Sequence, residues 1–300
     1  ITSAVIAVRV GITKGLRPLS KISHAIGKRP PQDLSPINLK IVPDEVTTFI
    51  MALNDLLERA RLDISRQRRF ASNAAHQLLT PLAGLKTYAQ LAQKEDDVDK
   101  IKELLQTQTD GFDRMTRTVQ QLLSLSKAEH AITRASSFKP VDLNIIVSDA
   151  TTDIVPESID RQVELDFHSD DSQALVEGDQ VSLRELTTNL LENALRYNRP
   201  GGTVTIEITS NETIDLIIED DGIGIPEGER ERVFERFYRV TGSDLDITGS
   251  GLGLAIVSEI AKAHNAEVSI SEGSDQKGTR IKVSFPRVEI KEETDSTDIV

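Results

Sequence analysis

Two stretches of the chain carry apolar residues at gaps that alternate between four and three. The first covers residues 71–92, the second covers residues 101–122, and the polar run Lys-Glu-Asp-Asp at 94–97 separates them. The seam positions are Ala71, Ala75, Leu78, Leu82, Leu85, Ala89 and Ala92, then Ile101, Leu105, Gln108, Phe112, Met115, Val119 and Leu122. This spacing predicts two helices that pack along one seam. We therefore expect a helical hairpin over 67–130, and because a hairpin buries only one face of each helix, we expect two copies to pair as a four-helix bundle.

One histidine, His76, lies on the first of these helices. It follows the seam position Ala75 and therefore lies on the flank of the helix, where a partner domain could reach it. Thr80 and Pro81 follow one turn later, and the proline removes a helical hydrogen bond from the carbonyl of Gln77. Taken alone, this segment is equally compatible with a surface histidine on an ordinary coiled coil.

The N-terminal part has a weaker pattern. Residues 1–13 are mostly apolar but include Arg9, and they are fewer than the roughly 20 residues that cross a bilayer. We interpret them as the end of a truncated membrane span, with a mobile N-terminal helix as the alternative. Residues 14–66 hold two short amphipathic segments joined by a proline-containing connector. They predict two helices, which either form a relay module between two chains or pack on this chain's own core.

From Val141 the pattern changes to short strands alternating with helices. Helices are expected at 142–152 and 179–197, and strands at 163–167, 203–208, 214–219, 268–270 and 279–285. This order predicts an α/β sandwich over 141–287, with helices on one face of a mixed sheet. Residues 131–140 have no periodicity and are expected to be a linker, and the charged residues 288–300 are expected to be a disordered tail.

The net charge and the absence of cysteine exclude some classes of function. The net charge of −13 argues against nucleic acid as a partner, because phosphate binding needs a basic surface. The chain has no cysteine, which excludes disulfides and thiolate metal sites and fits a reducing cytoplasm.

Four clusters in the second half carry candidate chemistry. Asn189 and Asn193 lie four residues apart on one helix face, and their amide oxygens suit Mg²⁺. The run Asp-Asp-Gly-Ile-Gly at 220–224 follows a strand, a Phe-rich segment lies at 233–239, and a glycine-rich loop at 248–253 runs into a helix, where free N–H groups can bind phosphate. Each cluster alone has an ordinary structural explanation. The order and spacing of the four clusters together are much more specific evidence of a nucleotide site than any one cluster alone.

These residues resemble a known family. Residues 70–82 are similar to the phosphoacceptor box of bacterial sensor histidine kinases, and the four clusters resemble the nucleotide-binding boxes of the Bergerat (GHKL) ATP fold. Residues 14–66 look like a HAMP relay. The resemblance implies a multidomain α and α+β fold: a helical HAMP module, a dimeric hairpin four-helix bundle, and an α/β sandwich that binds ATP.

The resemblance also implies roles for individual residues. Asp220 would bind the adenine amino group, Gly222 and Gly224 would shape the adenine pocket, and Asn193 would hold Mg²⁺ with assistance from Asn189. The other nucleotide-binding residues implied are Arg196, Tyr197, Gly249, Gly251, Leu252 and Gly253. Residues 238–248 would form a mobile lid over ATP.

The implied reaction is ATP-dependent phosphorylation of His76, followed by transfer to an aspartate of a response regulator. Related ATPases have a glutamate where this chain has Asn189, and an amide cannot act as the base that activates water. Two residues of the phosphoacceptor box depart from the family pattern. Gln77 replaces an acidic residue that would accept the imidazole proton, and Leu79 replaces an arginine. Thr80 matches the position that orients water during dephosphorylation of a partner.

The departures leave two alternatives open, a catalytically weak ATP-binding scaffold and a family member whose phosphatase activity dominates. The implied setting is a homodimer that meets a response regulator receiver domain. The chain would be the cytoplasmic portion of an inner membrane protein, attached through an N-terminal span missing from this fragment.

Overall fold

A computed structural model describes residues 27, 30, 33–37, 44–131, 138–170, 173–240, 249–274 and 277–288. The chain divides into two compact units, Ile1–Ala75 and His76–Val300. The predictions for residues 1–13, for the first relay helix and for most of the tail concern residues outside the described ones. None of the helices within the described residues has the length and apolar content needed to cross a membrane.

The first unit contains the start of a long helix, α2 (Asp44–Ala92), which continues into the second unit. Ile37 and Ile50 are buried together, and Leu53 and Leu57 pack against them. The side chain of Asn54 accepts a hydrogen bond from the Ile37 N–H at 2.7 Å and donates one to the Ile37 carbonyl at 3.2 Å. These contacts fix the short segment 33–37 to the helix. The HAMP relay itself stays a prediction.

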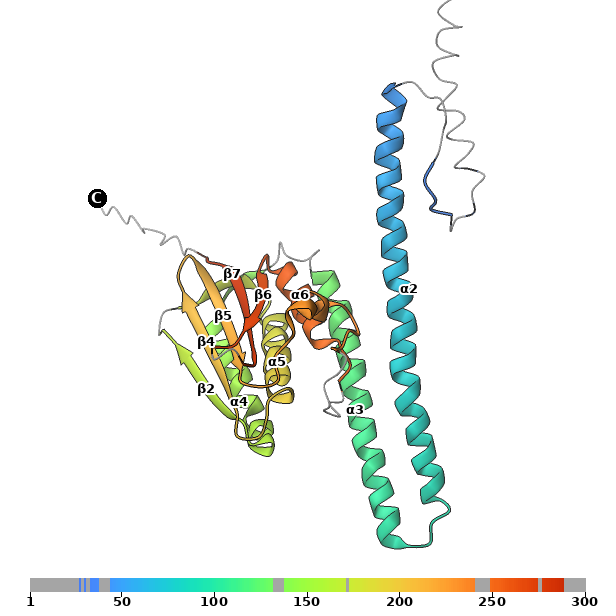
Figure 1. The fold of residues 1–300 in the computed structure, drawn as a ribbon, viewed down its shortest axis with the longest axis vertical. Coiled ribbons are helices and arrows are strands. Elements are labelled where there is room, and N and C mark those ends of the chain that lie inside the picture. The colour runs from blue at the N-terminus through green and yellow to red at the C-terminus, as the bar shows by residue number, and fades with distance from the viewer. Residues whose placement is uncertain are drawn as a thin grey trace, which may run out of the picture. The chain divides into compact units, whose positions relative to one another are not determined.

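In the second unit, α2 and α3 (Val98–Ala131) form the expected hairpin around the turn at 93–97 (Figure 1). The helices approach closely where Leu85 is buried, since a Cβ placed on Gly111 would lie only 2.7 Å from Leu85 Cδ2. Other seam residues stay exposed in the single chain: Leu82, Leu105, Phe112 and Val119. The hairpin therefore leaves one apolar face uncovered.

The rest of the second unit is built on a five-stranded mixed sheet of order β2-β4-β5-β7-β6. The strands are β2 (Glu164–Ser169), β4 (Thr203–Ser210), β5 (Thr213–Asp220), β6 (Glu267–Glu272) and β7 (Thr279–Pro286). Only β2 and β4 run parallel; the other neighbours are antiparallel. Alternation explains the two faces: Ile281, Val283 and Phe285 of β7 are buried, while Arg280 and Lys282 form ion pairs with acidic side chains of β5.

Three helices cover one face of this sheet: α4 (Leu143–Arg161), α5 (Gln180–Arg196) and α6 (Gly253–Ala263) (Figure 1). Asp142 and Asp179 cap the first two, each accepting a hydrogen bond from a backbone N–H of the first turn. Two short 3₁₀ helices, η2 (Glu227–Glu229) and η3 (Arg232–Phe234), follow β5. This α/β sandwich confirms the fold class expected for the second half.

Two details differ from the sequence expectations. Helix α4 continues past residue 152 to Arg161, because Pro156 lies on its exposed side, where water can reach the carbonyl that the proline leaves unbonded. A two-stranded antiparallel sheet of β1 (Lys139–Asp142) and β3 (Leu175–Gly178) was not anticipated, and β1 begins inside the segment suggested as a linker. Pro140 and Asp142 in β1, and Gly178 in β3, are residue types that are depleted in strands.

Candidate functional site

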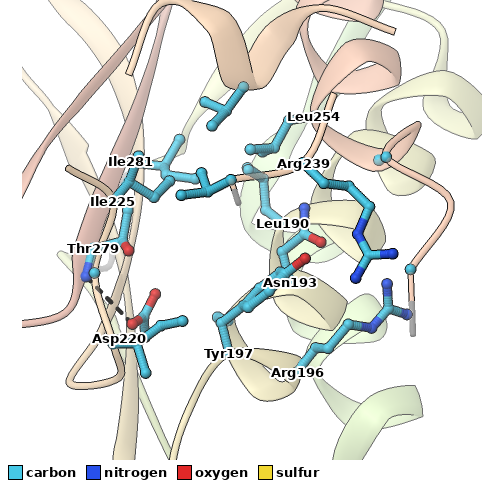
Figure 2. Close-up of a pocket in the computed structure, with 18 of the residues that line it drawn as sticks. Leu190, Asn193, Arg196, Tyr197, Asp220, Ile225, Arg239, Leu254, Thr279 and Ile281 are labelled. Carbon is cyan, nitrogen blue, oxygen red and sulfur yellow. Dashed lines mark hydrogen bonds between the residues drawn. The ribbon is translucent and has the colours of Figure 1, made fainter. Parts of the chain in front are cut away.

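A pocket opens between α5, the ends of β5 and β7, and the loops that follow β5 and precede α6. Its apolar lining includes Leu190, Ile218, Ile223, Ile225, Leu254 and Ile281. Its polar lining includes Asn193, Arg196, Tyr197, Asp220, Arg239 and Thr279. Figure 2 shows Asp220 and Thr279 at one end, the two guanidinium groups at the other, and Asn193 and Tyr197 between them. The pocket is therefore polarised, with an acid at one end and cations at the other.

At the acidic end, Asp220 is the last residue of β5 and is only 7% exposed. Its Oδ1 accepts hydrogen bonds from the backbone N–H groups of Gly222, at 3.0 Å, and Thr279, at 3.2 Å. Burial raises the pKa of this carboxyl from 3.8 to about 6, although the two N–H groups favour the charged form. The fold thus holds a buried hydrogen-bond acceptor against the apolar part of the pocket.

Near the middle of the pocket, two asparagines of α5 face the first residue of α6. The Nδ2 of Asn193 is buried without a hydrogen-bond partner among the described residues. Asn189 donates its Nδ2 to the Glu185 carbonyl at 2.9 Å, which leaves its Oδ1 toward Gly253. A Cβ at Gly253 would lie 3.1 Å from that Oδ1 and 3.2 Å from Asn193 Nδ2. Gly253 therefore packs closely against both amides. A buried amide without a partner among the described residues fits a site for a polar ligand, and rotating the amide by 180° presents its oxygen as a hard ligand for a cation.

The cationic end combines side chains with the start of a helix. Arg196 and Arg239 line the pocket together with Gly249, Ser250 and Gly251. Helix α6 begins at Gly253 with no side-chain hydrogen bond from its N-cap residue. Free N–H groups at a helix N-terminus bind anions, and guanidinium groups add charge that matches phosphate. This end of the pocket can therefore accept an anionic group.

Most of the predicted nucleotide-binding residues line this single pocket. They are Asn193, Arg196, Tyr197, Asp220, Gly224, Gly249, Gly251 and Gly253. The remaining three, Asn189, Gly222 and Leu252, are not lining residues but contact those that are: Gly222 through Asp220, Asn189 beside Gly253, and Leu252 through Ser250. Of the expected lid, residues 241–248 lie outside the described part of the chain.

The other three predicted residues lie together on α2 and do not line the pocket. His76 is exposed and Gln77 is half-buried. Thr80 donates its hydroxyl proton to the His76 carbonyl at 3.0 Å, one turn back along the helix. Leu79, beside them, is 63% exposed. The histidine is therefore open to an approaching partner.

Two family models match the regions that carry this geometry. The model "His Kinase A (phospho-acceptor) domain" matches residues 66–131, which contain His76. The model "Histidine kinase-, DNA gyrase B-, and HSP90-like ATPase" matches residues 178–289, which contain the pocket. The chain belongs to the bacterial two-component sensor histidine kinases.

Curated relatives agree with this family. The chain is 33% identical to the sensor protein kinase PmrB of Pseudomonas aeruginosa over 281 residues, which cover 93% of this chain and 58% of PmrB. It is 35% identical to the sensor protein QseC of Escherichia coli over 286 residues, which cover 93% of this chain and 61% of QseC. This sensor kinase chain thus spans about three fifths of the length of these relatives.

A solved structure agrees with the fold. The histidine kinase ThkA in complex with the response regulator protein TrrA matches with a TM-score of 0.60 and 18% identity, covering 76% of this chain and 64% of that one. At this identity the match supports the fold alone.

Sequence reasoning missed several residues of the site in this sensor kinase. Thr279 donates its N–H to Asp220 and lines the pocket, and Gly278 precedes it. A Cβ at Gly278, whose φ is +70°, would lie 1.7 Å from the Asp220 carbonyl oxygen. Their only signal was a Gly-Thr pair at the start of a strand. That pair has meaning only in the β5–β7 register, which places Thr279 opposite Asp220.

Proposed function

We propose that this chain is the kinase core of a two-component sensor, which phosphorylates His76 from ATP and passes the phosphoryl group to an aspartate of a response regulator. The polarity of the pocket carries the proposal. A buried acceptor beside the apolar lining suits adenine, and a cationic helix start, reached past Asn193 and Tyr197, suits the triphosphate.

The pocket residues have complementary roles in this proposal. Asp220 accepts the adenine amino N–H, and the apolar lining packs on the ring. Arg196, with the glycine-rich loop and the first N–H groups of α6, binds the phosphate oxygens. The Asn193 amide, with Asn189 beside it, would hold Mg²⁺, which neutralises charge on the phosphates when it is bound.

The phosphoryl transfer forms a bond between an imidazole nitrogen of His76 and the γ-phosphorus, and it breaks the bond from that phosphorus to the bridging oxygen of ADP. The imidazole must lose its N–H proton in the process. Gln77 cannot take that proton because an amide is not a base at neutral pH, so water is the acceptor and Gln77 orients it. Asn189 likewise cannot activate water against ATP, which preserves the phosphoryl group for His76.

The proposed setting follows from the exposed surfaces and the family. The uncovered apolar face of the hairpin, with Phe112 at 51% exposure, pairs with a second copy. The exposed flank with His76 meets the receiver domain of the response regulator. We also propose that the chain is the cytoplasmic portion of an inner membrane protein.

Incubation of the purified chain with Mg²⁺ and γ-labelled ATP tests the proposal. We expect label that is acid-labile and alkali-stable, as a phosphoimidazole is. His76→Ala should abolish it, whereas His168→Ala, which removes an exposed histidine from β2, should retain it. A chain that binds ATP but never acquires label would instead support the signalling scaffold.

The position of Thr80 supports a second activity, dephosphorylation of the response regulator. The Thr80 hydroxyl lies one turn from His76 on an exposed face, where it can orient water during dephosphorylation of the regulator. Thr87 is a matched control, because its hydroxyl makes the same bond to the Ala83 carbonyl at 3.0 Å. Dephosphorylation of the phosphorylated regulator should slow in Thr80→Ala and not in Thr87→Ala; equal rates would remove this role.

A further inference from the structure

The glycine-rich loop of the pocket is hydrogen-bonded to α3, the second helix of the hairpin, which we call the stalk helix. The hydroxyl of Ser250 donates a hydrogen bond to Oε1 of Gln121 at 2.7 Å, although the two residues are 129 positions apart. The same hydroxyl oxygen accepts a hydrogen bond from the Leu252 N–H at 3.2 Å. One side chain therefore connects the stalk to the backbone of the loop that precedes α6.

The contact between α3 and the sandwich combines buried apolar residues with polar side chains around them. Leu125 and Ala128 of α3 are buried, and α3 packs on α6. Around them, burial raises the pKa values of Glu185 and Glu192 on α5. A hydrogen bond from Ser124 to Glu185, and the charges of Arg196 and Arg117 near Glu192, act against that rise. Interfaces of this composition between parts of one chain are separable. The contact is suited to opening rather than to permanent attachment.

The Leu252 N–H belongs to the group of donors that a phosphate would use. Helix α6 starts directly after it, and its first N–H groups have no partners within the helix. An anion at this end of the pocket attracts those N–H groups. A phosphate oxygen and the Ser250 hydroxyl oxygen then compete for the same donor, and a displaced Ser250 no longer holds Gln121.

We propose that Gln121 and Ser250 form a latch that triphosphate binding opens, so that nucleotide releases the sandwich from the stalk helix. The inference rests on the proposed function, because it requires that the pocket takes ATP. Coupling of this kind is reciprocal: the closed latch weakens triphosphate binding by the same factor by which triphosphate weakens the latch. Gln121 acts here as a positioning residue, through Ser250.

Affinity measurements on the full chain test the latch. A non-transferable ATP analogue should bind about two- to tenfold more tightly to Gln121→Ala than to the wild type, the range that one net hydrogen bond supplies. Adenosine should bind both equally, because it has no phosphate to compete for the Leu252 N–H. Alanine favours helix, so the variant should keep α3 intact. Gln120→Ala is the matched control, since the neighbouring Gln120 is exposed.

The binding results distinguish failure of the latch from failure of the proposed function. Equal or weaker binding of the analogue to Gln121→Ala overturns the latch, and so does an equal change for adenosine. If wild-type chain binds adenosine but not the analogue, the proposed function falls and the latch with it. If the wild type is labelled on His76 but Gln121→Ala binds the analogue unchanged, only the latch is wrong.

The opening itself can be measured, because the chain has no native cysteine. Spin labels at Lys102→Cys on α3 and Asp160→Cys on α4 would report the distance between stalk and sandwich. Dilution into excess unlabelled chain restricts the signal to one protomer. The analogue should add a second, broader distance population, which Gln121→Ala should show already without nucleotide. A single unchanged distance in all samples would contradict the latch.

Discussion

The two functional regions of the chain are prepared for chemistry to different extents. The nucleotide pocket gathers residues from α5, α6, β5, β7 and the loops that follow β5 and precede α6, and its acid is buried with a raised pKa. The hairpin places His76, Gln77 and Thr80 within one helical segment, with the histidine exposed. The pocket is thus assembled by the long-range fold, whereas the phosphoacceptor segment is assembled by the helix itself.

This difference predicts where the chain tolerates change. A pocket built from distant segments depends on backbone register, so substitutions that shift a strand end should remove function together with stability. A segment built within one helix depends on its own side chains, so substitutions there should change rates and leave the fold intact. The following experiments separate these two behaviours.

The largest effect is expected from Gly278→Ala. Its Cβ would lie 1.7 Å from the Asp220 carbonyl oxygen at a φ of +70°, so β7 must move away from β5. Overpacking and the left-handed backbone together should cost about 2–5 kcal/mol of unfolding free energy, and nucleotide binding should disappear. Denaturant unfolding and nucleotide titration measure both.

Two further glycines are controls for this substitution. Gly201 has a φ of +79° and no atom within 4 Å of an added Cβ, so Gly201→Ala measures the unfolding free energy lost to the left-handed backbone alone. Gly84→Ala on α2 also meets nothing within 4 Å and should instead stabilise the helix, by about 0.5–1 kcal/mol. Similar losses in all three variants would contradict the proposed difference between pocket and hairpin.

Asp220→Asn should affect binding and stability in opposite directions. Loss of the charged acceptor should weaken nucleotide binding about 10- to 100-fold. Because the pKa of Asp220 rises from 3.8 to about 6 on folding, the folded protein binds the proton more tightly than the unfolded chain does. The stability that this proton binding contributes is fully present below about pH 4 and is lost as pH rises through about 6. The variant should therefore be more stable than wild type by about 1–3 kcal/mol at pH 7.5, with the gain vanishing near pH 4. A destabilised variant at pH 7.5 would contradict the assigned burial cost.

The same titration should appear in binding. Adenosine has no phosphate that titrates in this range, so its affinity reports Asp220 directly. As pH falls from 7 to 5 the carboxylate protonates with a pKa of about 6, and the affinity should drop roughly tenfold. Isothermal titration at several pH values gives the curve, and a flat profile would show that adenine does not use the ionised carboxylate.

The sequence predicted the hairpin and the sandwich because their signals are local: heptad gaps in the hairpin, and short strands alternating with helices in the sandwich. It also predicted residues that the structure gathers around one pocket, through motifs whose members are close in sequence. It did not predict that Thr279 would support Asp220 or that Gln121 would hold Ser250, because these pairs depend on strand register and on the packing of α3. Strands β1 and β3 escaped notice because they contain Pro140, Asp142 and Gly178, residue types that are depleted in strands.

The smallest effect concerns the hairpin alone. Gln77→Glu supplies a carboxylate beside His76 that can accept the imidazole proton, so autophosphorylation should become faster. A positioned general base contributes roughly 10²- to 10⁴-fold, but adjacent residues on a helix do not face one another, so we expect only about three- to tenfold.

Gln90→Glu is the matched control, an exposed glutamine on the same helix that receives the same charge. Initial rates of label incorporation at saturating ATP measure the effect, and nucleotide affinity should be equal in both variants because neither residue lines the pocket. A rate unchanged in Gln77→Glu, or raised equally in Gln90→Glu, would mean that proton removal from His76 does not limit the reaction. The phosphoacceptor segment would then depend on its distance from the nucleotide and not on the residue that follows the histidine.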